Sequence, residues 1–422
     1  MSRCSWHLTL RMFLCLALVF CCPHAYAQEV VYERVTDASQ LLDGGKYIIV
    51  GSKKDYAMGV QNANNRTGVN IKNYWDGDVI KGLPIATKEG EEDKVYEFSL
   101  YQNSWSRKWG LYDSVYKGFL FAPDSKDVNH MQLKGNNNGN VPVEAEATIQ
   151  ITKGDDGEIV SRILFPESTK NKERLLLHYL NSGGKVYFSC YNKDYKTNVV
   201  LYRKRVGMFN ISRYSYSTYT CNIRYRMPQG CTGFVVLRAI DEGNGVLLLA
   251  ERYKEGDIVP ANTPLLIKGD EGQYSVYQTA RKSDAELETR VKAENLLHGE
   301  FDAEGNVCYD IANKEKYEYF KLNVKDGQNI GFYWGAPDGA PFKMTRTDRA
   351  YLVLPREEAR RVKGLMLDEA MVETRINSPA EHALPSDKVY DLSGRICQGA
   401  LAPGIYIRGG RKVLGGGKKI MA

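Results

Sequence analysis

The 422-residue sequence contains only one long hydrophobic run, and it lies at the N-terminus. This run, Met12–Cys22, follows the basic residues Arg3 and Arg11 and precedes a small-x-small pattern at residues 25–27. The arrangement is typical of a cleaved signal peptide and predicts that residues 1–27 are removed on export. No later apolar run approaches the roughly 18 residues of a membrane-spanning helix, so no transmembrane span is expected in the mature chain.

The N-terminal leader leaves one alternative open. Residues 18–21 resemble a lipobox ending at Cys21, but the bulky Phe20 stands where a small residue is expected. We therefore expect an exported protein that begins at Gln28. Its predicted location is the periplasm, the outer-membrane surface or the extracellular space.

Cysteine is scarce after the leader, where the only cysteines are Cys190, Cys221, Cys231, Cys308 and Cys397. No pair has the C-x-x-C spacing, so neither a zinc site nor a redox motif is expected. In an oxidising compartment, a disulfide between Cys221 and Cys231 would bridge two neighbouring strands. Buried free thiols that act as small apolar side chains are the alternative.

Catalytic motifs are also lacking. The four histidines after the leader form neither H-E-x-x-H nor H-x-x-x-H, and G-x-S-x-G does not occur. Cys190 and His178 are the nearest nucleophile and base in sequence, but the alternating residues before Cys190 indicate an ordinary strand. Oxygen-rich turns at 76–78 and 302–306 lack the full spacing of a calcium loop. We expect no catalytic residue, metal or cofactor, and favour a protein that is not an enzyme.

The net charge of the body of the chain is close to zero. Without Arg3 and Arg11, the 57 basic residues become 55, against 51 acidic residues. Five of those 55 lie in the last twenty positions, which contain no acidic residue. A nucleic-acid partner is not expected, because such binding needs a basic face on a folded domain.

Short alternating runs of apolar and polar residues, separated by turn formers, are abundant and predict β-strands. In residues 28–205, which we call the first block, the predicted strands are residues 30–35, 46–50, 95–101, 118–122, 148–152, 186–191 and 199–204. In residues 206–368, which we call the second block, the predicted strands are residues 213–227, 233–240, 246–253, 265–267, 316–322, 329–335, 349–355 and 364–368. One short helix is predicted, with Ser283 and Glu286 as a capping box and Leu287, Val291 and Leu297 as its apolar side.

The predicted fold is therefore all-β. It consists of an N-terminal domain over residues 28–205 and a central domain over residues 206–368, each a barrel or sandwich. A trefoil is one alternative for the first domain, because uneven recurrences are visible there. A linker over 369–387, with two prolines and no periodicity, then leads to a short C-terminal β tail over 388–422.

Several segments resemble secreted modular proteins of the Bacteroidetes. The tail motifs V-Y-D-L-S-G-R-I (389–396) and P-G-I-Y-I-R-G-G-R-K-V (403–413) are similar to the end of sorting domains read by the type IX secretion system. The segments at 258–269, 329–335 and 349–355 resemble a β-rich module that commonly precedes such tails. The resemblance implies a surface or envelope location, with the secretion machinery as a partner of the tail, and it implies no activity. Because the match is shorter than a sorting domain, packing of the tail on the central domain is the alternative.

Aromatic residues are the richest feature, with 28 Tyr and 5 Trp. Tyr74, Trp75, Trp105 and Trp109 gather in the first block, where exposed rings would stack on sugars or anchor a protein partner. Packing of these rings into the core is the alternative. The sequence thus suggests a binding, adhesive or structural protein with a glycan or a host or envelope protein as its ligand. A secreted hydrolase of glycan or peptide, with its site in the N-terminal domain, is the second hypothesis.

Overall fold

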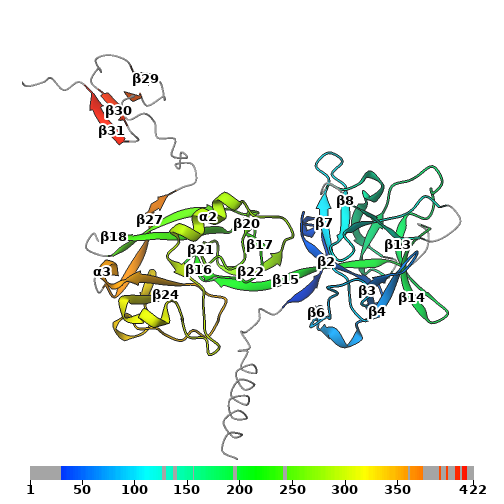
Figure 1. Cartoon of the computed structure of the whole chain (residues 1–422), viewed down its shortest axis with the longest axis horizontal. Helices are drawn as coiled ribbons and strands as arrows, with labels where there is room; N and C mark the ends of the chain where they lie inside the picture. The colour runs from blue at the N-terminus through cyan, green and yellow to red at the C-terminus, as the bar shows by residue number, and fades with distance from the viewer. Residues whose placement is uncertain are drawn as a thin grey trace, which may run out of the picture. The chain divides into compact units, whose positions relative to one another are not determined.

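The computed structural model describes residues 30–373, apart from 126–129, 136–139, 155, 193–196, 241–244 and 360–361, together with four tail segments, 389–390, 396–397, 404–408 and 411–415. As predicted, the described chain is mainly β, with two large sheets and a small third one (Figure 1). It divides into two units, Met1–Met371 and Val372–Ala422. The predicted signal peptide, and the predicted linker from residue 374 onward, lie outside the described residues.

The described part of the first block contains fifteen strands. They are β1 (Val31–Arg34), β2 (Lys46–Gly51), β3 (Tyr56–Gln61), β4 (Arg66–Asn70), β5 (Trp75–Asp76), β6 (Val79–Lys81), β7 (Phe98–Gln102), β8 (Trp109–Asp113), β9 (Gly118–Phe121), β10 (Gln132–Gly135), β11 (Thr148–Lys153), β12 (Ile159–Leu164), β13 (Leu176–Ser182), β14 (Lys185–Tyr191) and β15 (Val199–Ile211). Short 3₁₀ helices lie at Ala38–Gln40, Lys72–Tyr74 and Val143–Ala145. Each strand predicted in this block overlaps one of these strands.

The strand pairings of this block form a closed circuit. In order, β2 pairs with β3, β3 with β4, β4 with β14, β14 with β13, β13 with β12, β12 with β15, and β15 with β2. Such closure gives a barrel-like ring. Its strands are apolar on both faces, because Ile49 and Leu201 belong to one core cluster while Ile48 and Tyr202 belong to another.

Strand β15 continues past the predicted domain boundary at Arg205. Its first half pairs with β2 and its second half pairs with β22 (Gly272–Gln278). The Asp43 carboxylate also accepts hydrogen bonds of 2.8 and 2.7 Å from Nε and Nη2 of Arg281. The first and second blocks therefore share one sheet within the first unit.

Nine strands of the second block form a sheet in the order β16, β21, β18, β19, β27, β25, β24, β26, β23. Their bounds are β16 (Tyr216–Tyr219), β18 (Thr232–Ile240), β19 (Val246–Tyr253), β21 (Leu265–Lys268), β23 (Leu297–His298), β24 (Tyr317–Lys325), β25 (Asn329–Trp334), β26 (Tyr351–Pro355) and β27 (Gly364–Glu373). Strands β17 (Tyr225–Arg226) and β20 (Ile258–Val259) pair within the first sheet, and 3₁₀ helices lie at Ile311–Lys316 and Pro337–Gly339. The apolar run of β21 is fully buried, as predicted, with Leu265, Leu266 and Ile267 all 0% exposed.

Helix α2 (Ala285–Glu294) is the predicted helix, but its N-cap differs from the prediction, and Leu297, predicted on its apolar side, lies beyond it in strand β23. Asp284 caps the helix, and its Oδ1 accepts hydrogen bonds from the backbone N–H of Glu286 at 3.0 Å and of Leu287 at 3.1 Å. Ser283, the predicted cap, instead donates to the Glu288 carboxylate at 2.8 Å. A carboxylate at this position accepts two orphan N–H groups at once and favours the positive end of the helix dipole.

Other elements also differ from the prediction, because no strand was predicted where β3, β4, β5, β6, β8, β10, β12, β13 and β22 lie. A four-residue helix, α3 (Arg356–Ala359), follows β26 and was not predicted. Strand β27 runs to Glu373, beyond the predicted end of the central domain at Asp368. Among the described residues, no helix combines the length and the apolar character needed to cross a membrane.

In the second unit, four short antiparallel strands form a sheet in the order β29, β28, β30, β31. They are β28 (Val389–Tyr390), β29 (Ile396–Cys397), β30 (Gly404–Arg408) and β31 (Arg411–Gly415). All four lie within the predicted C-terminal β tail over 388–422.

Candidate functional site

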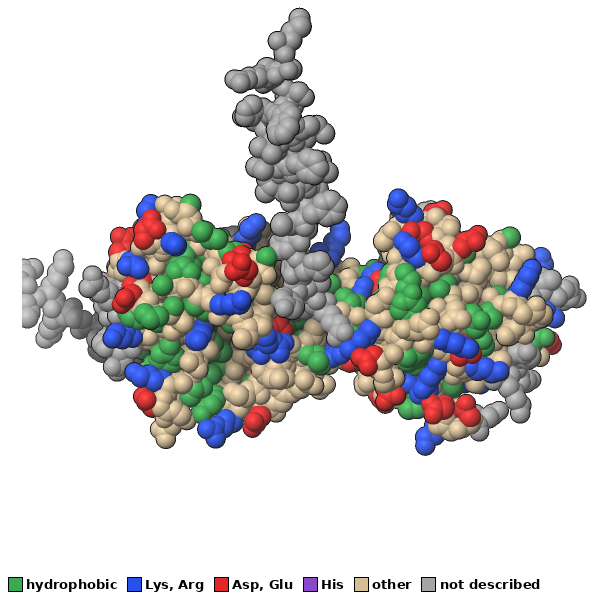
Figure 2. All heavy atoms as spheres, turned by 90° about the horizontal axis from the view of Figure 1, so that it is seen from below, with side chains coloured by type: hydrophobic (Ala, Val, Ile, Leu, Met, Phe, Trp, Pro, Cys, Tyr) green, Lys and Arg blue, Asp and Glu red, His purple; other side chains and the backbone are tan. Residues whose placement is uncertain are grey.

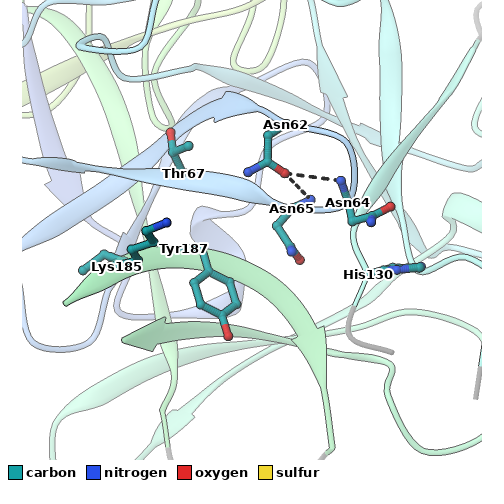
Figure 3. A pocket seen from close by; sticks show the side chains of 8 residues that line it. Asn62, Asn64, Asn65, Thr67, His130, Lys185 and Tyr187 are labelled. Atoms are coloured by element: carbon teal, nitrogen blue, oxygen red, sulfur yellow. Dashed lines mark hydrogen bonds between the residues drawn. The ribbon is translucent and has the colours of Figure 1, made fainter. Parts of the chain in front are cut away.

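A polar groove lies between the β3–β4 hairpin and the start of strand β14 and has a volume of about 550 Å³. We call it the asparagine groove; its lining residues are Asn62, Asn64, Asn65, Thr67, His130, Lys185, Val186 and Tyr187. Figure 3 shows the three asparagines on the hairpin loop, with Tyr187 and Lys185 on the neighbouring strand β14. A groove of this size accommodates a small ligand.

The hairpin loop of the groove is held by its own asparagine. Asn62 Oδ1 accepts hydrogen bonds from the backbone N–H of Asn64 at 3.3 Å and of Asn65 at 3.1 Å (Figure 3). Asn62 N–H donates to the Asn65 carbonyl at 2.9 Å, and Met131 N–H donates to the Asn64 carbonyl at 2.8 Å. Asparagine suits such a turn because its short side chain bonds to backbone groups two or three residues ahead.

The opposite wall of the groove follows a tight hairpin between β13 and β14. Gly183 and Gly184 have φ values of 57° and 79°, the left-handed conformation that a two-residue turn of this type requires. Strand β14 then pairs with β4 through Tyr187 opposite Thr67. This pairing sets the Tyr187 side chain beside the asparagine loop.

Several polar atoms of the groove remain available to a ligand. Among the described residues, the Lys185 ammonium and the Tyr187 hydroxyl have no hydrogen-bond or ion-pair partner. Thr67 Oγ1 is buried without a hydrogen-bond partner among the described residues. These hydroxyl and ammonium groups provide donors and acceptors of the kind that bind sugar hydroxyls, and the tyrosine ring adds an apolar face.

Strand β4 is anchored next to the groove by a buried ion pair. Arg66 Nη2 lies 2.5 Å from Asp113 Oδ2, and both side chains are 0% exposed. The Arg66 guanidinium lies 5.1 to 5.3 Å from the ring centroids of Tyr96, Phe98 and Tyr116. Nη1 of Arg66 also donates to the Gly59 carbonyl of β3 at 3.2 Å. Arg66 therefore joins β4 to β3, the two strands that carry the asparagine loop, and its ion pair joins β4 to β8.

The four aromatic residues predicted to bind ligand lie in separate settings. Trp75 Nε1 donates to the Lys54 carbonyl at 3.0 Å, and its ring packs edge-on against Tyr202 with centroids 5.6 Å apart. Tyr74 and Trp75 both pack on the core cluster that contains Tyr202, whereas Trp109 packs on the other cluster of the first block. Trp105 lies in the β7–β8 turn and is 94% exposed. Of the four, only Trp105 presents most of its ring to solvent.

Sequence reasoning missed the asparagine groove, although two signals were present. The S-G-G sequence at 182–184 is typical of a tight turn and N-A-N-N at 62–65 of a loop, but their separation in sequence hides their proximity. No protein-family model matches the chain, and no curated protein matches it in sequence. The groove is therefore assigned from its geometry.

The cysteines whose side chains the structure describes show no sign of activation. Cys190 is fully buried, and burial raises the pKa of its thiol far above the ordinary value, so the nucleophilic thiolate is disfavoured. Cys221 and Cys231 are both buried in one core cluster, and the structure records each as a free thiol. The disulfide that the sequence suggested between them is not formed in this structure.

The oxygen-rich turn at residues 302–306 uses its leading carboxylate internally. Asp302 Oδ1 accepts hydrogen bonds from Glu304 N–H at 2.9 Å and Asn306 N–H at 2.8 Å, and Oδ2 accepts one from Asn306 Nδ2 at 2.8 Å. Within the described residues, no group of three or more His, Cys, Asp or Glu side chains is arranged to hold a metal ion.

Proposed function

We propose that this chain is an exported binding protein whose asparagine groove recognises a glycan. The observation that carries the proposal is the composition of the groove: three asparagines, a lysine, a threonine and a tyrosine converge on one open cavity of about 550 Å³. Neutral amides and hydroxyls bind sugars by paired donor and acceptor contacts, and an aromatic face stacks on the apolar side of a sugar ring.

The lining of the groove favours binding over the hydrolase hypothesis. Glycoside hydrolysis by the common mechanisms needs two carboxylates facing each other across the bond to be cleaved. Among the described residues that line the groove, none is an aspartate or a glutamate. No observation on the described residues supports a hydrolytic site elsewhere in the first block.

The proposed location is the cell envelope or surface, and it rests on the sequence. The basic, apolar and small-residue segments of the leader support export. The tail motifs at 389–396 and 403–413 support membership of the secreted modular proteins of the Bacteroidetes and contact with their type IX secretion machinery. A glycan of the envelope or of a host surface is the ligand that fits such a location.

A glycan array with the chain from Gln28 onward tests the proposal. We expect Tyr187→Ala to weaken binding to the selected glycan by about tenfold, since ring stacking and a hydroxyl hydrogen bond together contribute about 1–2 kcal/mol. Lys185→Ala should weaken it less, and Trp105→Ala, which removes the most exposed predicted ring, should leave it unchanged.

The array has two outcomes that would contradict the proposal. Loss of binding in Trp105→Ala with full binding in Tyr187→Ala would move the site to the β7–β8 turn. Cleavage of an arrayed glycan would support the hydrolase hypothesis instead.

A further inference from the structure

A second cavity lies in the central block, away from the residues of the asparagine groove, and has a volume of about 380 Å³. We call it the arginine pocket. Residues from the end of β15, from β16, from the β24–β25 hairpin and from the segment before β26 line it: Asn210, Ser212, Tyr216, Ser217, Thr218, Leu322, Asn323, Val324, Ile330, Met344, Thr345, Arg346 and Arg349. Two arginines and no acidic residue occur among them.

The two arginines of the pocket differ in their partners. Arg346 is neutralised by Asp348, because its Nε lies 2.9 Å from Asp348 Oδ1 and its Nη2 contacts Oδ2. Arg349 has no ion-pair partner among the described residues. Its Nη1 donates to the Thr218 carbonyl at 2.9 Å and to the Ser217 hydroxyl, and no bond to a described residue engages its Nε or Nη2. The positive charge of Arg349 is therefore not compensated by a described residue, and the Nε–Nη2 edge of its guanidinium can still donate hydrogen bonds.

Burial makes this uncompensated charge costly. Arg349 is half-buried, and desolvation lowers the pKa of its guanidinium even though Asp348 opposes the shift. A guanidinium taken out of water is best stabilised by a hydrogen-bonded anion. The Nε and Nη2 groups lie side by side on one edge of the guanidinium, and this edge matches the two oxygens of a carboxylate. The Ser217 hydroxyl accepts from Arg349 and so keeps its own proton for the same anion.

Part of the pocket wall is apolar. Leu322 and Val324 of β24, Ile330 of β25 and Met344 are all partly exposed and line the cavity. Apolar side chains do not stabilise a bare inorganic ion, whereas they bury the hydrocarbon part of an organic molecule. A single uncompensated cation also suits a monoanion better than a dianion.

We propose that the arginine pocket binds a small organic carboxylate, with the carboxylate on the Nε–Nη2 edge of Arg349 and the apolar part against Leu322, Val324 and Ile330. This site is separate from the asparagine groove and does not depend on the function proposed for that groove.

Calorimetric titration of the chain from Gln28 onward with hexanoate, acetate and neutral hexanamide tests the proposal. Hexanoate is expected to bind more tightly than either of the other two probes, because acetate lacks the apolar part and hexanamide lacks the charge. Arg349→Gln should weaken hexanoate binding by at least about tenfold, as expected for loss of a charge-assisted bidentate contact. Arg349→Lys should give an intermediate loss, and the matched control Arg290→Gln, on the exposed side of α2, should bind as the wild type does.

Equal binding of hexanoate by Arg349→Gln and the wild type would overturn the proposal. If the variant does not fold, the wild type alone decides: hexanamide bound as tightly as hexanoate, sulfate bound more tightly than hexanoate, or no binding of hexanoate refutes carboxylate recognition. Glycan binding by Arg349→Gln should remain unchanged, which separates this site from the groove.

Discussion

Arg66 and Asp113 lie in different strands, 47 positions apart, and form an ion pair from which water is excluded. Asp113 Oδ1 also accepts hydrogen bonds from Val115 N–H at 2.8 Å and Tyr116 N–H at 3.1 Å, so the carboxylate is bonded on both oxygens. A buried pair contributes little relative to an apolar replacement, but removal of one partner leaves a buried charge without compensation.

We expect Arg66→Met to lower the free energy of unfolding by about 3–5 kcal/mol, because Asp113 is then left buried and unpaired. Asp113→Asn should lower the free energy of unfolding by a similar amount. Asparagine still accepts hydrogen bonds from the two backbone N–H groups, but it carries no charge, so Arg66 is left as a buried cation without an anionic partner. The double variant should lower the free energy of unfolding by clearly less than the sum of the two single losses, because it leaves no buried charge unpaired. Urea unfolding followed by circular dichroism measures all three.

The exposed pair of Lys134 and Glu144, with atoms 3.2 Å apart, serves as the control. Lys134→Met should change the free energy of unfolding by less than about 1 kcal/mol, as is usual for ion pairs in water. Additive losses in the double variant of Arg66 and Asp113 would contradict the pairing argument.

Individual binding residues were the hardest feature to predict from sequence. The aromatic composition pointed to Trp75, but its ring and indole N–H are engaged by Tyr202 and by the Lys54 carbonyl. Tyr187 and the loop at 62–65 looked like ordinary strand and turn residues. Their convergence depends on the pairing of β4 with β14, which local patterns do not reveal.

Helix α2 shows how an element can be predicted while its boundary is missed. The capping-box pattern favoured Ser283, because Glu286 follows it by three residues, although Asp284 is an equally good N-cap residue. The structure places Asp284 at the cap, with bonds to two backbone N–H groups. The buried residues Leu287 and Val291 were predicted correctly because they follow helical spacing.

Asp284→Ala is expected to lower the free energy of unfolding by about 1 kcal/mol, since it removes the acceptor for two N–H groups at the start of α2. Ser283→Ala should cost only a few tenths of that, because it removes one exposed side-chain contact to Glu288. Thermal unfolding of the two variants beside the wild type distinguishes them. A larger loss in Ser283→Ala would restore the serine as the cap.

Strand β4 was not predicted, and its glycine explains why. Gly68 lowers the strand propensity of R-T-G-V-N, so the segment shows no clear alternation. The structure requires glycine there, because a Cβ atom on Gly68 would lie 2.4 Å from Cγ1 of Val186 in β14. The close approach that makes the strand hard to recognise also brings the two walls of the groove together.

At the scale of the whole molecule, the all-β prediction is confirmed, whereas the sharing of a sheet by the two blocks was not foreseen. The apolar pattern at 199–204 predicts the first half of β15, but the segment after Arg205 alternates less clearly. Basic and acidic side chains are interspersed on the face shown in Figure 2, in keeping with the nearly neutral composition. Composition and periodicity are averaged over many residues, so they predict the fold class correctly even where single segments deviate from the pattern.

The abundance of tyrosine has a further consequence for the whole molecule, because many of these side chains are fully buried: Tyr47, Tyr96, Tyr202, Tyr219, Tyr225, Tyr253, Tyr319 and Tyr351. Burial raises the pKa of Tyr47 and of Tyr202 to about 12, so the folded protein prefers the neutral phenol. In the unfolded chain the phenol ionises near its ordinary pKa of about 10. The stabilisation is therefore fully present below about pH 10 and is lost as the pH rises toward 12.

We expect the free energy of unfolding to stay nearly level up to about pH 10 and then to fall, by about 1.4 kcal/mol for each unit of pKa shift released. Urea titrations at successive pH values measure this fall, and phenolate absorbance reports the ionisation. Tyr47→Phe should reduce the slope, while its lost hydrogen bonds to Leu42 N–H and the Gln40 carbonyl, both 2.8 Å, should lower stability at neutral pH. A free energy of unfolding that stays level while the buried phenols ionise would refute the link, because ionisation inside the folded core would then carry no cost.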